Sequence, residues 1–191
     1  MRIVAGTFRG RTIDGPTWDG LRPTSDSLRE TLFNVLGPTV LGVRVLDAFA
    51  GTGAVGIEAV SRGAAHVTFI ERDPRAIALI EHNITRLSAQ STCAILRGDF
   101  MRAQVTAGAS RADALAKAEQ FDLVFLDPPY DLPALDDAIR RAATLTAPGG
   151  RVVVEHSKKR DVAAAVPGLA KYRTLTAGDS ALSFYTAVEV A

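Results

Sequence analysis

The sequence predicts an α/β fold with a mostly parallel seven-stranded sheet, an antiparallel strand at its C-terminal end and an N-terminal β-hairpin extension. Short apolar runs alternate with helical patterns from Val43 onward, which is typical of repeated βαβ units with right-handed crossovers and helices on both faces of the sheet. A glycine-rich turn follows the first run, and the last two runs flank a turn at residues 178–181 that is typical of a hairpin. The length of 191 residues accommodates one such domain and a short extension.

The elements are expected wherever a local pattern changes. The parallel strands are continuous apolar runs, because both of their faces are buried. Strands are expected at residues 43–47, 66–71, 92–96, 121–126, 151–155, 172–177 and 182–188. Helices are expected near residues 54–62, 74–88, 133–145 and 160–165. The alanine-rich polar segment 104–120 is too long for a simple connection and is expected to hold a surface helix.

Residues 1–36 are expected to form an extension ahead of a main domain at 37–191. Two short strands at 2–4 and 11–13, joined across two glycines, predict a hairpin. An isolated hairpin is only marginally stable in water, so this one must dock on the main domain or be steadied by a partner.

A helix is expected at the end of this extension. Residues 27–30 fit a capping box, and apolar residues then repeat at helical spacing up to Leu36. The pair Gly37-Pro38 is expected to end the helix.

Composition excludes several classes of protein. A hydrophobic fraction of 47%, a charged fraction of 23% and a net charge of +1 predict a globular protein without a globally basic surface. The sequence has no long apolar segment of the kind that would predict secretion or membrane spanning. We therefore expect a cytoplasmic protein. Cys93 lies in an apolar stretch and is expected to be a buried structural thiol, while three scattered histidines predict no metal site.

A glycine-rich turn follows the first expected strand. Gly51, Gly53 and Gly56 satisfy the G-x-G-x-x-G pattern, and Glu71 ends the second strand about twenty residues later, where a carboxylate can accept two ribose hydroxyls. Asp47 ends the first strand, and its negative charge would oppose a pyrophosphate at the helix N-terminus. That charge suits a cationic ligand such as S-adenosylmethionine, which carries a sulfonium and an ammonium group.

Two further strand ends carry carboxylates. Asp99, after the third strand, is placed to accept a hydrogen bond from an adenine amino group, with Phe100 beside the ring. The fourth strand ends in Asp127-Pro128-Pro129-Tyr130, in which two prolines fix the turn and direct carbonyl groups outward. A planar exocyclic amino group could donate to the Asp127 carboxylate and to the Pro128 carbonyl while its ring stacks on Tyr130. The plain alternative is a strand-ending turn with a solvated aspartate.

These motifs together resemble class I S-adenosylmethionine-dependent methyltransferases, which have a Rossmann-like fold, and Asp-Pro-Pro-Tyr resembles the motif of those that methylate exocyclic amino nitrogens. The segments 2–6, 10–11, 22–34, 51–59 and 61–64 more closely resemble the bacterial RsmD family of 16S rRNA guanine-N2 methyltransferases. The resemblance spans residues 2 to about 155 and is looser at 178–185. It implies methyl transfer to N2 of one guanine in 16S rRNA, within an assembled or assembling small ribosomal subunit. We expect the protein to be a monomer.

The expected site residues have three roles. The catalytic set is Asp127, Pro128, Pro129 and Tyr130. The cofactor-binding set is Arg22, Thr24, Asp47, Phe49, Gly51, Gly53, Glu71, Arg72, Asp99, Phe100 and Asp127. The RNA-binding set is Arg2, Arg9 and Arg11 of the hairpin, with Lys158 and Lys159 of a basic run that continues to Arg160. The hairpin arginines have no acidic residue among them, which favours contacts with phosphate.

Two other functions agree with the same motifs. The first is adenine-N6 methylation of DNA or RNA, because the same acceptor pair serves either amine. A large target-recognition domain would favour DNA as the substrate, and 191 residues do not accommodate one. The second is a non-catalytic RNA-binding assembly factor that retains a cofactor pocket, against which the intact Asp127-Pro128-Pro129-Tyr130 argues.

Overall fold

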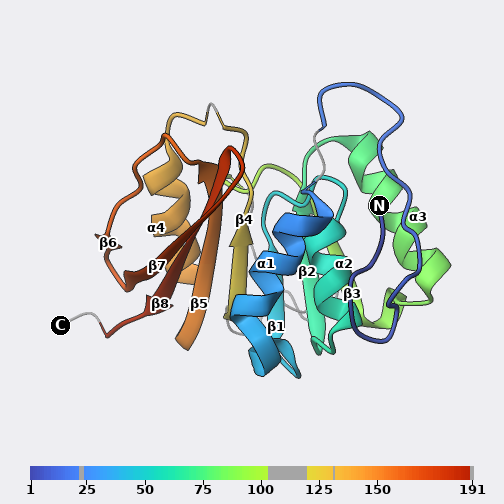
Figure 1. The fold of residues 1–191 in the computed structure, drawn as a ribbon, viewed down its shortest axis with the longest axis horizontal. Coiled ribbons are helices and arrows are strands. Elements are labelled where there is room, and N and C mark those ends of the chain that lie inside the picture. The colour runs from blue at the N-terminus through green and yellow to red at the C-terminus, as the bar shows by residue number, and fades with distance from the viewer. Residues whose placement is uncertain (22–23, 103–119, 131, 190–191) are drawn as a thin grey trace. The chain divides into compact units, whose positions relative to one another are not determined.

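The computed structural model describes residues 1–21, 24–102, 120–130 and 132–189. Its contacts divide the chain into two compact units, Met1–Asp99 and Phe100–Ala191, and each is described by itself (Figure 1). The expected boundary at residue 36 stays a prediction, although the contacts group the N-terminal extension with the residues that follow it.

The first unit contains three parallel strands in the order β3-β2-β1. The register pairs Asp47 with Phe69 and Glu71 with Arg97, so the strands end along one edge. The strands of this unit are β1 (Arg44–Asp47), β2 (His66–Glu71) and β3 (Cys93–Arg97). Its helices are α1 (Asp26–Leu36), α2 (Ala54–Ser61) and α3 (Pro74–Leu87), with short 3-10 turns η1 (Gly37–Val40) and η2 (Gln90–Thr92).

The helix α2 packs closely against the sheet at Gly56. A Cβ atom at this position would lie 2.3 Å from the ring of Phe69 on β2, so only glycine permits the approach. This is the role that the third glycine of the pattern has in helix–strand packing.

The N-terminal segment forms a reduced hairpin that docks on α2. A single antiparallel bridge joins Arg2 to Thr12, and Ile3 and Ile13 are buried. The buried carboxylate of Glu58 on α2 accepts hydrogen bonds from the backbone N–H groups of Val4 and Ala5, at 2.8 and 2.9 Å. The expected need for docking is therefore met within this unit, and in Figure 1 the segment continues alongside α3.

The helix α1 begins two residues earlier than the expected capping box. Its N-cap is Ser25, whose hydroxyl accepts from the backbone N–H of Leu28 at 3.2 Å. Ser27 lies inside the helix instead, and its carbonyl accepts from the Thr31 hydroxyl. The capping box at 27–30 is thus wrong, because another serine satisfies the first free N–H groups of the helix.

The second unit contains five of the eight strands in the described residues, in the order β4-β5-β8-β7-β6. β5 is parallel to β4, β8 is antiparallel to β5, and β7 is antiparallel to β8, as expected for a closing hairpin. The strands are β4 (Phe121–Leu126), β5 (Thr146–Ser157), β6 (Ala165–Val166), β7 (Leu169–Ala177) and β8 (Ser180–Ala187). The helix α4 (Leu135–Leu145) packs against β4 and β5 through apolar residues at helical spacing.

Two expectations for this unit need comment. The helix near 160–165 is wrong: the segment leads into β6, which turns at Pro167 and Gly168 and pairs with β7. A stretch of six residues is too short to form a helix without help, and of these residues only Ala165 lies in a strand. The two-residue β6 also makes the strand count eight rather than seven. The expected surface helix at 104–120 lies almost wholly outside the described residues.

Candidate active site

The end of β1 places Asp47 beneath the glycine turn. Its side chain is 1% exposed, and its Oδ2 accepts a hydrogen bond from the backbone N–H of Gly56 at 2.9 Å. Burial raises the pKa of Asp47 to about 7, and the nearby Glu71 carboxylate contributes in the same direction. The carboxylate therefore holds the start of α2. A cation that binds nearby would stabilise its ionised form.

The end of β2 places Glu71 against the other side of the same turn. Its Oε2 accepts from the N–H of Gly51 at 2.8 Å, and its Oε1 accepts from the N–H groups of Arg72 and Asp73 at 2.7 and 2.8 Å. An ionised carboxylate has about four acceptor positions, so Oε2 retains capacity for a ligand hydroxyl. The geometry thus joins two of the expected cofactor residues directly, Glu71 and Gly51.

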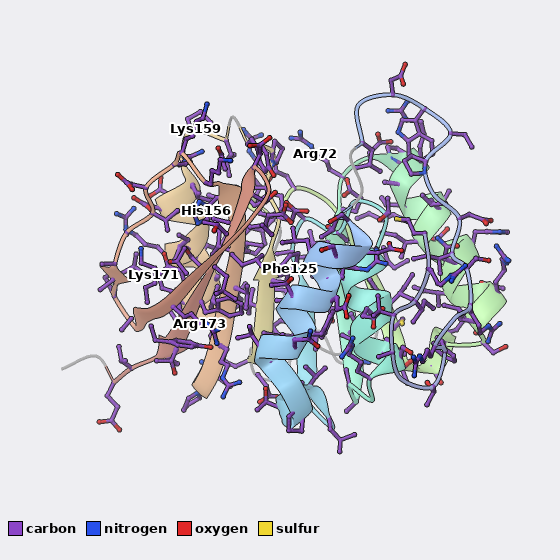
Figure 2. The ribbon with its side chains drawn as sticks, in the orientation of Figure 1. Arg72, Phe125, His156, Lys159, Lys171 and Arg173 are labelled. Atoms are coloured by element: carbon purple, nitrogen blue, oxygen red, sulfur yellow. The ribbon has the colours of Figure 1, made fainter. Side chains whose placement is uncertain are left out.

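The end of β3 brings Asp99 near Arg72. The Arg72 Nη1 lies 3.8 Å from the Asp99 Oδ2, and the arginine side chain is 71% exposed. Figure 2 shows the Arg72 side chain projecting away from its ribbon. Phe100 is 1% exposed, and the guanidinium carbon of Arg141 lies 5.3 Å from the centre of its ring. The predicted contact between Phe100 and an adenine would require this buried ring to move.

The remaining expected cofactor residues of the first unit come from the turn after β1 and from the sequence ahead of α1. Phe49 is half-buried in the turn after β1. The Thr24 carbonyl accepts from the guanidinium of the buried Arg29 at 3.2 Å, so Thr24 belongs to the packing ahead of α1. Arg22 lies outside the described residues.

A contact that the sequence did not indicate lies near the glycine turn. The side chain of Leu21 would be 3.2 Å from a Cβ atom at Gly51, and the Trp18 ring lies 5.1 Å from the guanidinium carbon of Arg75 at the start of α3. The loop that carries Trp18 and Leu21 therefore borders the glycine turn. No motif in this loop could have indicated it, because the contacts join residues about thirty to sixty positions apart.

In the second unit, the turn after β4 presents the Asp-Pro-Pro-Tyr motif. Asp127 is half-buried, Pro128 is buried, and Pro129 and Tyr130 are exposed, Tyr130 by 40%. The Pro129 carbonyl accepts from the N–H of Leu132 at 2.9 Å, which closes the turn. All peptide bonds of the described motif are trans. The turn thus exposes the aromatic side chain of Tyr130 three positions after the half-buried Asp127.

The hydroxyl of Tyr130 meets a buried carboxylate that the sequence did not indicate. It lies 2.5 Å from the Ser180 Oγ and 3.4 Å from the Oε1 of Glu155, and the Ser180 hydroxyl donates to the same oxygen at 3.1 Å. Glu155 is 5% exposed. The one sequence signal was a glutamate directly after the apolar run 152–154, because such a charge is rarely buried without partners.

The expected RNA-binding cations differ in how free their side chains are. Arg2, Arg9 and Arg11 are all exposed, but the Arg11 guanidinium also donates to the Arg86 carbonyl at 2.7 Å and lies over the ring of Phe8. Lys158 donates to the Gly178 carbonyl and pairs with Asp179, both at 2.9 Å.

Lys159 is exposed at the turn after β5, where Figure 2 labels its side chain. Arg160 is used within the protein, since its guanidinium donates to the carbonyls of Tyr130 and Pro133 at 3.3 and 3.2 Å. In the basic run 158–160, the side chains of Lys158 and Arg160 are thus bonded within the protein, and both lysines are exposed.

Two further findings concern the described residues only. None of their His, Cys, Asp and Glu side chains form a group of three or more that could hold a metal ion. None of the helices in this part of the chain combines the length and apolar character needed to cross a bilayer.

The whole chain has the fold of known methyltransferases. It aligns over 100% of its length with 99% of a solved Escherichia coli structure described as "Putative methyltransferase yhhF", with a TM-score of 0.81 and 32% identity. A Haemophilus influenzae structure described as "putative methylase HI0767" aligns over 98% of both chains, with a TM-score of 0.75 and 29% identity. The expected fold class is confirmed: this is an α/β methyltransferase.

The sequence comparisons define the family. The family model described as "Conserved hypothetical protein 95" matches residues 1–186. A Bacillus subtilis protein described as "Putative rRNA methyltransferase YlbH" is 35% identical over 97% of this chain and 98% of its own length. The Ribosomal RNA small subunit methyltransferase D of Escherichia coli is 37% identical over 73% of this chain and 65% of its own length. The chain belongs to this family, the RsmD family of small-subunit rRNA methyltransferases.

Proposed function

We propose that this protein transfers a methyl group from S-adenosylmethionine to the exocyclic N2 of one guanine in 16S rRNA of the small ribosomal subunit. The observation that carries the proposal is the turn after β4, where a half-buried Asp127 precedes two trans prolines and an exposed Tyr130. The names of the relatives, which describe small-subunit rRNA methyltransferases, support the substrate class.

The first unit supplies groups that fit the cofactor. Among the described residues, no lysine or arginine forms an ion pair with Asp47 or Glu71, although both carboxylates adjoin the glycine turn. Two carboxylates without a basic partner suit a ligand that carries a sulfonium and an ammonium, and they oppose a pyrophosphate. A related RNA methyltransferase fold from Salinibacter ruber was solved with S-adenosyl-L-homocysteine, the demethylated product of this cofactor.

Each cofactor residue has a proposed task. Asp47 stabilises positive charge near the glycine turn, and Glu71 accepts ribose hydroxyls through its remaining capacity. Asp99 accepts from the adenine amino group, with Arg72 close enough to keep that carboxylate oriented. The cofactor supplies an electrophilic methyl group on its sulfonium.

The second unit supplies the groups that would act on the base. Guanine N2 is a weak nucleophile, because its lone pair is delocalised into the ring. Hydrogen bonds from the amino group to the Asp127 carboxylate and the Pro128 carbonyl would favour the pyramidal form and would stabilise positive charge developing on nitrogen. The N2–CH₃ bond forms as the S–CH₃ bond breaks, and Asp127, directly or through water, receives the proton that the nitrogen then loses.

Access to N2 requires an exposed base. A looped or flipped guanine could stack on Tyr130, whose ring has exposed surface. Because the chemistry needs no covalent enzyme intermediate, alignment of the reactants should supply much of the acceleration, about 7–11 kcal/mol for well-placed groups.

The test is transfer of a radiolabelled methyl group to three substrates: naked 16S rRNA, small ribosomal subunits from a bacterium that lacks this methyltransferase, and double-stranded DNA. We expect label in one or both RNA substrates and none in DNA. Label in DNA alone would favour the adenine-N6 alternative. Cofactor binding without transfer to any substrate would favour a non-catalytic assembly factor.

A further inference from the structure

The strands β5 and β8 carry two separate polar networks on opposite faces. The register pairs Glu155 with Leu182 and Ser157 with Ser180, so Glu155 and Ser180 are diagonal neighbours on one face. His156, labelled in Figure 2, points to the other face, where its Nε2 lies 2.9 Å from the Ser183 hydroxyl. Only the first of these networks reaches the Asp-Pro-Pro-Tyr turn.

The first network contains a buried carboxylate and two hydroxyl groups. Ser180 donates to the Glu155 Oε1, and Tyr130 can donate either to Ser180 or to the same carboxylate oxygen. Burial of a carboxylate is costly unless it is hydrogen-bonded, so the site is stable only while donors face Glu155. Tyr130 supplies one of these donors from a loop, while β8 supplies the other.

The backbone of the turn is held from the same side. The Arg160 guanidinium donates to the carbonyls of Tyr130 and Pro133, on both sides of the turn that follows the two prolines. The phenol ring of Tyr130 is therefore fixed at its hydroxyl end and at its backbone. A Tyr130 side chain held at both ends presents its exposed ring in one orientation.

We propose that Glu155 and Ser180 are positioning residues for methyl transfer, which fix the ring of Tyr130 so that the acceptor base stacks in register with Asp127. This inference rests on the proposed function, because it assigns Tyr130 to the base. Neither residue touches the base. Both act through the Tyr130 hydroxyl, and Arg160 has a supporting role rather than a contact with RNA phosphate.

The test compares single-turnover rates at saturating cofactor and saturating small ribosomal subunits. Tyr130→Phe retains the ring and removes the hydroxyl, and Ser180→Ala removes the bridging donor. Each should lower the rate by about 2–10-fold, the size of one lost hydrogen bond, with cofactor affinity unchanged. The double variant should show the loss of the larger single variant, because both changes break the same connection.

The matched control is Ser183→Ala, which removes a buried hydroxyl from the same strand on the opposite face. It should lower the melting temperature about as much as Ser180→Ala while its transfer rate stays at the wild-type value. Glu155→Gln keeps an acceptor oxygen toward the two hydroxyls and should stay within about twofold of wild type. Tyr130→Phe, which leaves the core intact, keeps the test valid if a Glu155 variant does not fold.

The outcomes separate the two proposals. Wild-type rates for Tyr130→Phe and Ser180→Ala, or losses that multiply in the double variant, would overturn the positioning role and leave the proposed function standing. Equal loss of rate in Ser180→Ala and Ser183→Ala would show a general effect of stability and would also overturn it. Absence of transfer by the wild-type protein would overturn the proposed function, and the positioning role with it.

Discussion

The two compact units hold their candidate residues by different means. In Met1–Asp99, the strand-end carboxylates bond to backbone N–H groups: Asp47 to Gly56, and Glu71 to Gly51. In Phe100–Ala191, the carboxylate of Glu155, two residues before the end of β5, bonds to side-chain hydroxyls instead. Backbone contacts fix the shape of a glycine turn, whereas hydroxyl contacts orient a single side chain. Substitutions in the first unit should therefore affect ligand affinity, and those in the second should affect turnover.

The largest expected effect is on turnover, from the second unit. Asp127→Ala should reduce single-turnover methyl transfer by about 10²–10³-fold, because the amino group loses its charged acceptor as positive charge develops. Calorimetric titration should give nearly wild-type affinity for S-adenosylmethionine. Turnover retained by this variant would place the chemistry elsewhere.

The next largest effect should be a pH-dependent loss of affinity in the first unit. The pKa of Asp47 is raised to about 7 by burial, so the unliganded protein favours the neutral carboxyl below that pH. A cationic ligand favours the charged form, so cofactor affinity should rise with pH up to about 7 and then level off. Asp47→Asn should bind more weakly at pH 8 and show little of this rise. An unchanged profile would separate Asp47 from the cofactor.

The same shift has a consequence for stability. The pKa of Asp47 in the folded state lies above the ordinary value of 3.8, so its protonated form stabilises the fold. This contribution to the free energy of unfolding is fully present below pH 3.8 and is lost as the pH rises through about 7. Relative to Asp47→Asn, the unliganded wild-type protein should lose stability over that range. Denaturant unfolding at several pH values measures the difference.

A smaller effect is expected from the exposed cations of both units. Arg9→Ala and Lys159→Ala should each flatten the log–log salt dependence of small-subunit binding by about 0.7–0.9, the value of one phosphate contact. Lys158→Ala is the matched control beside Lys159, because its ammonium is already paired with Asp179. An equal change of slope in both lysine variants would show that the ion pair of Lys158 with Asp179 does not decide which lysine contacts RNA phosphate.

The smallest effect is expected at the loop that borders the glycine turn. Trp18 is the single tryptophan of the chain, and its ring lies beside Arg75. Titration with S-adenosylmethionine should change its fluorescence in a saturable way. Arg75→Ala should weaken binding by no more than an exposed cation–π contact contributes, about 0.5–1 kcal/mol. Fluorescence that does not respond to saturating cofactor would place the loop outside the site.

Most of the fold could be predicted, because its strands are continuous apolar runs. The bounds of β2 and β4 match the expected residues, and those of β1 and β3 differ by one position. The helix at 160–165 was wrong: the segment has no helical or strand structure before Ala165, which pairs with Ala170 of β7, a residue later in the chain. Local pattern cannot decide between a short helix and a short strand when both satisfy the backbone.

The candidate site could be predicted only where one motif carries it. Glycine spacing indicated Gly51 and the distance to Glu71, and the structure joins them by a hydrogen bond. The partners of Tyr130 lie 25 and 50 positions away in the chain, and neither Glu155 nor Ser180 belongs to a motif. Such contacts depend on the register of β5 and β8, which a single sequence does not specify residue by residue.

The most direct test of the proposed function is the identity of the methylated nucleoside. Small ribosomal subunits from a bacterium that lacks this methyltransferase would be incubated with the protein and S-adenosylmethionine carrying a deuterated methyl group, then digested and analysed by mass spectrometry. We expect deuterated N2-methylguanosine with wild-type protein and its near absence with Asp127→Ala. Deuterated N6-methyladenosine, or N2-methylguanosine formed equally well by Asp127→Ala, would contradict it.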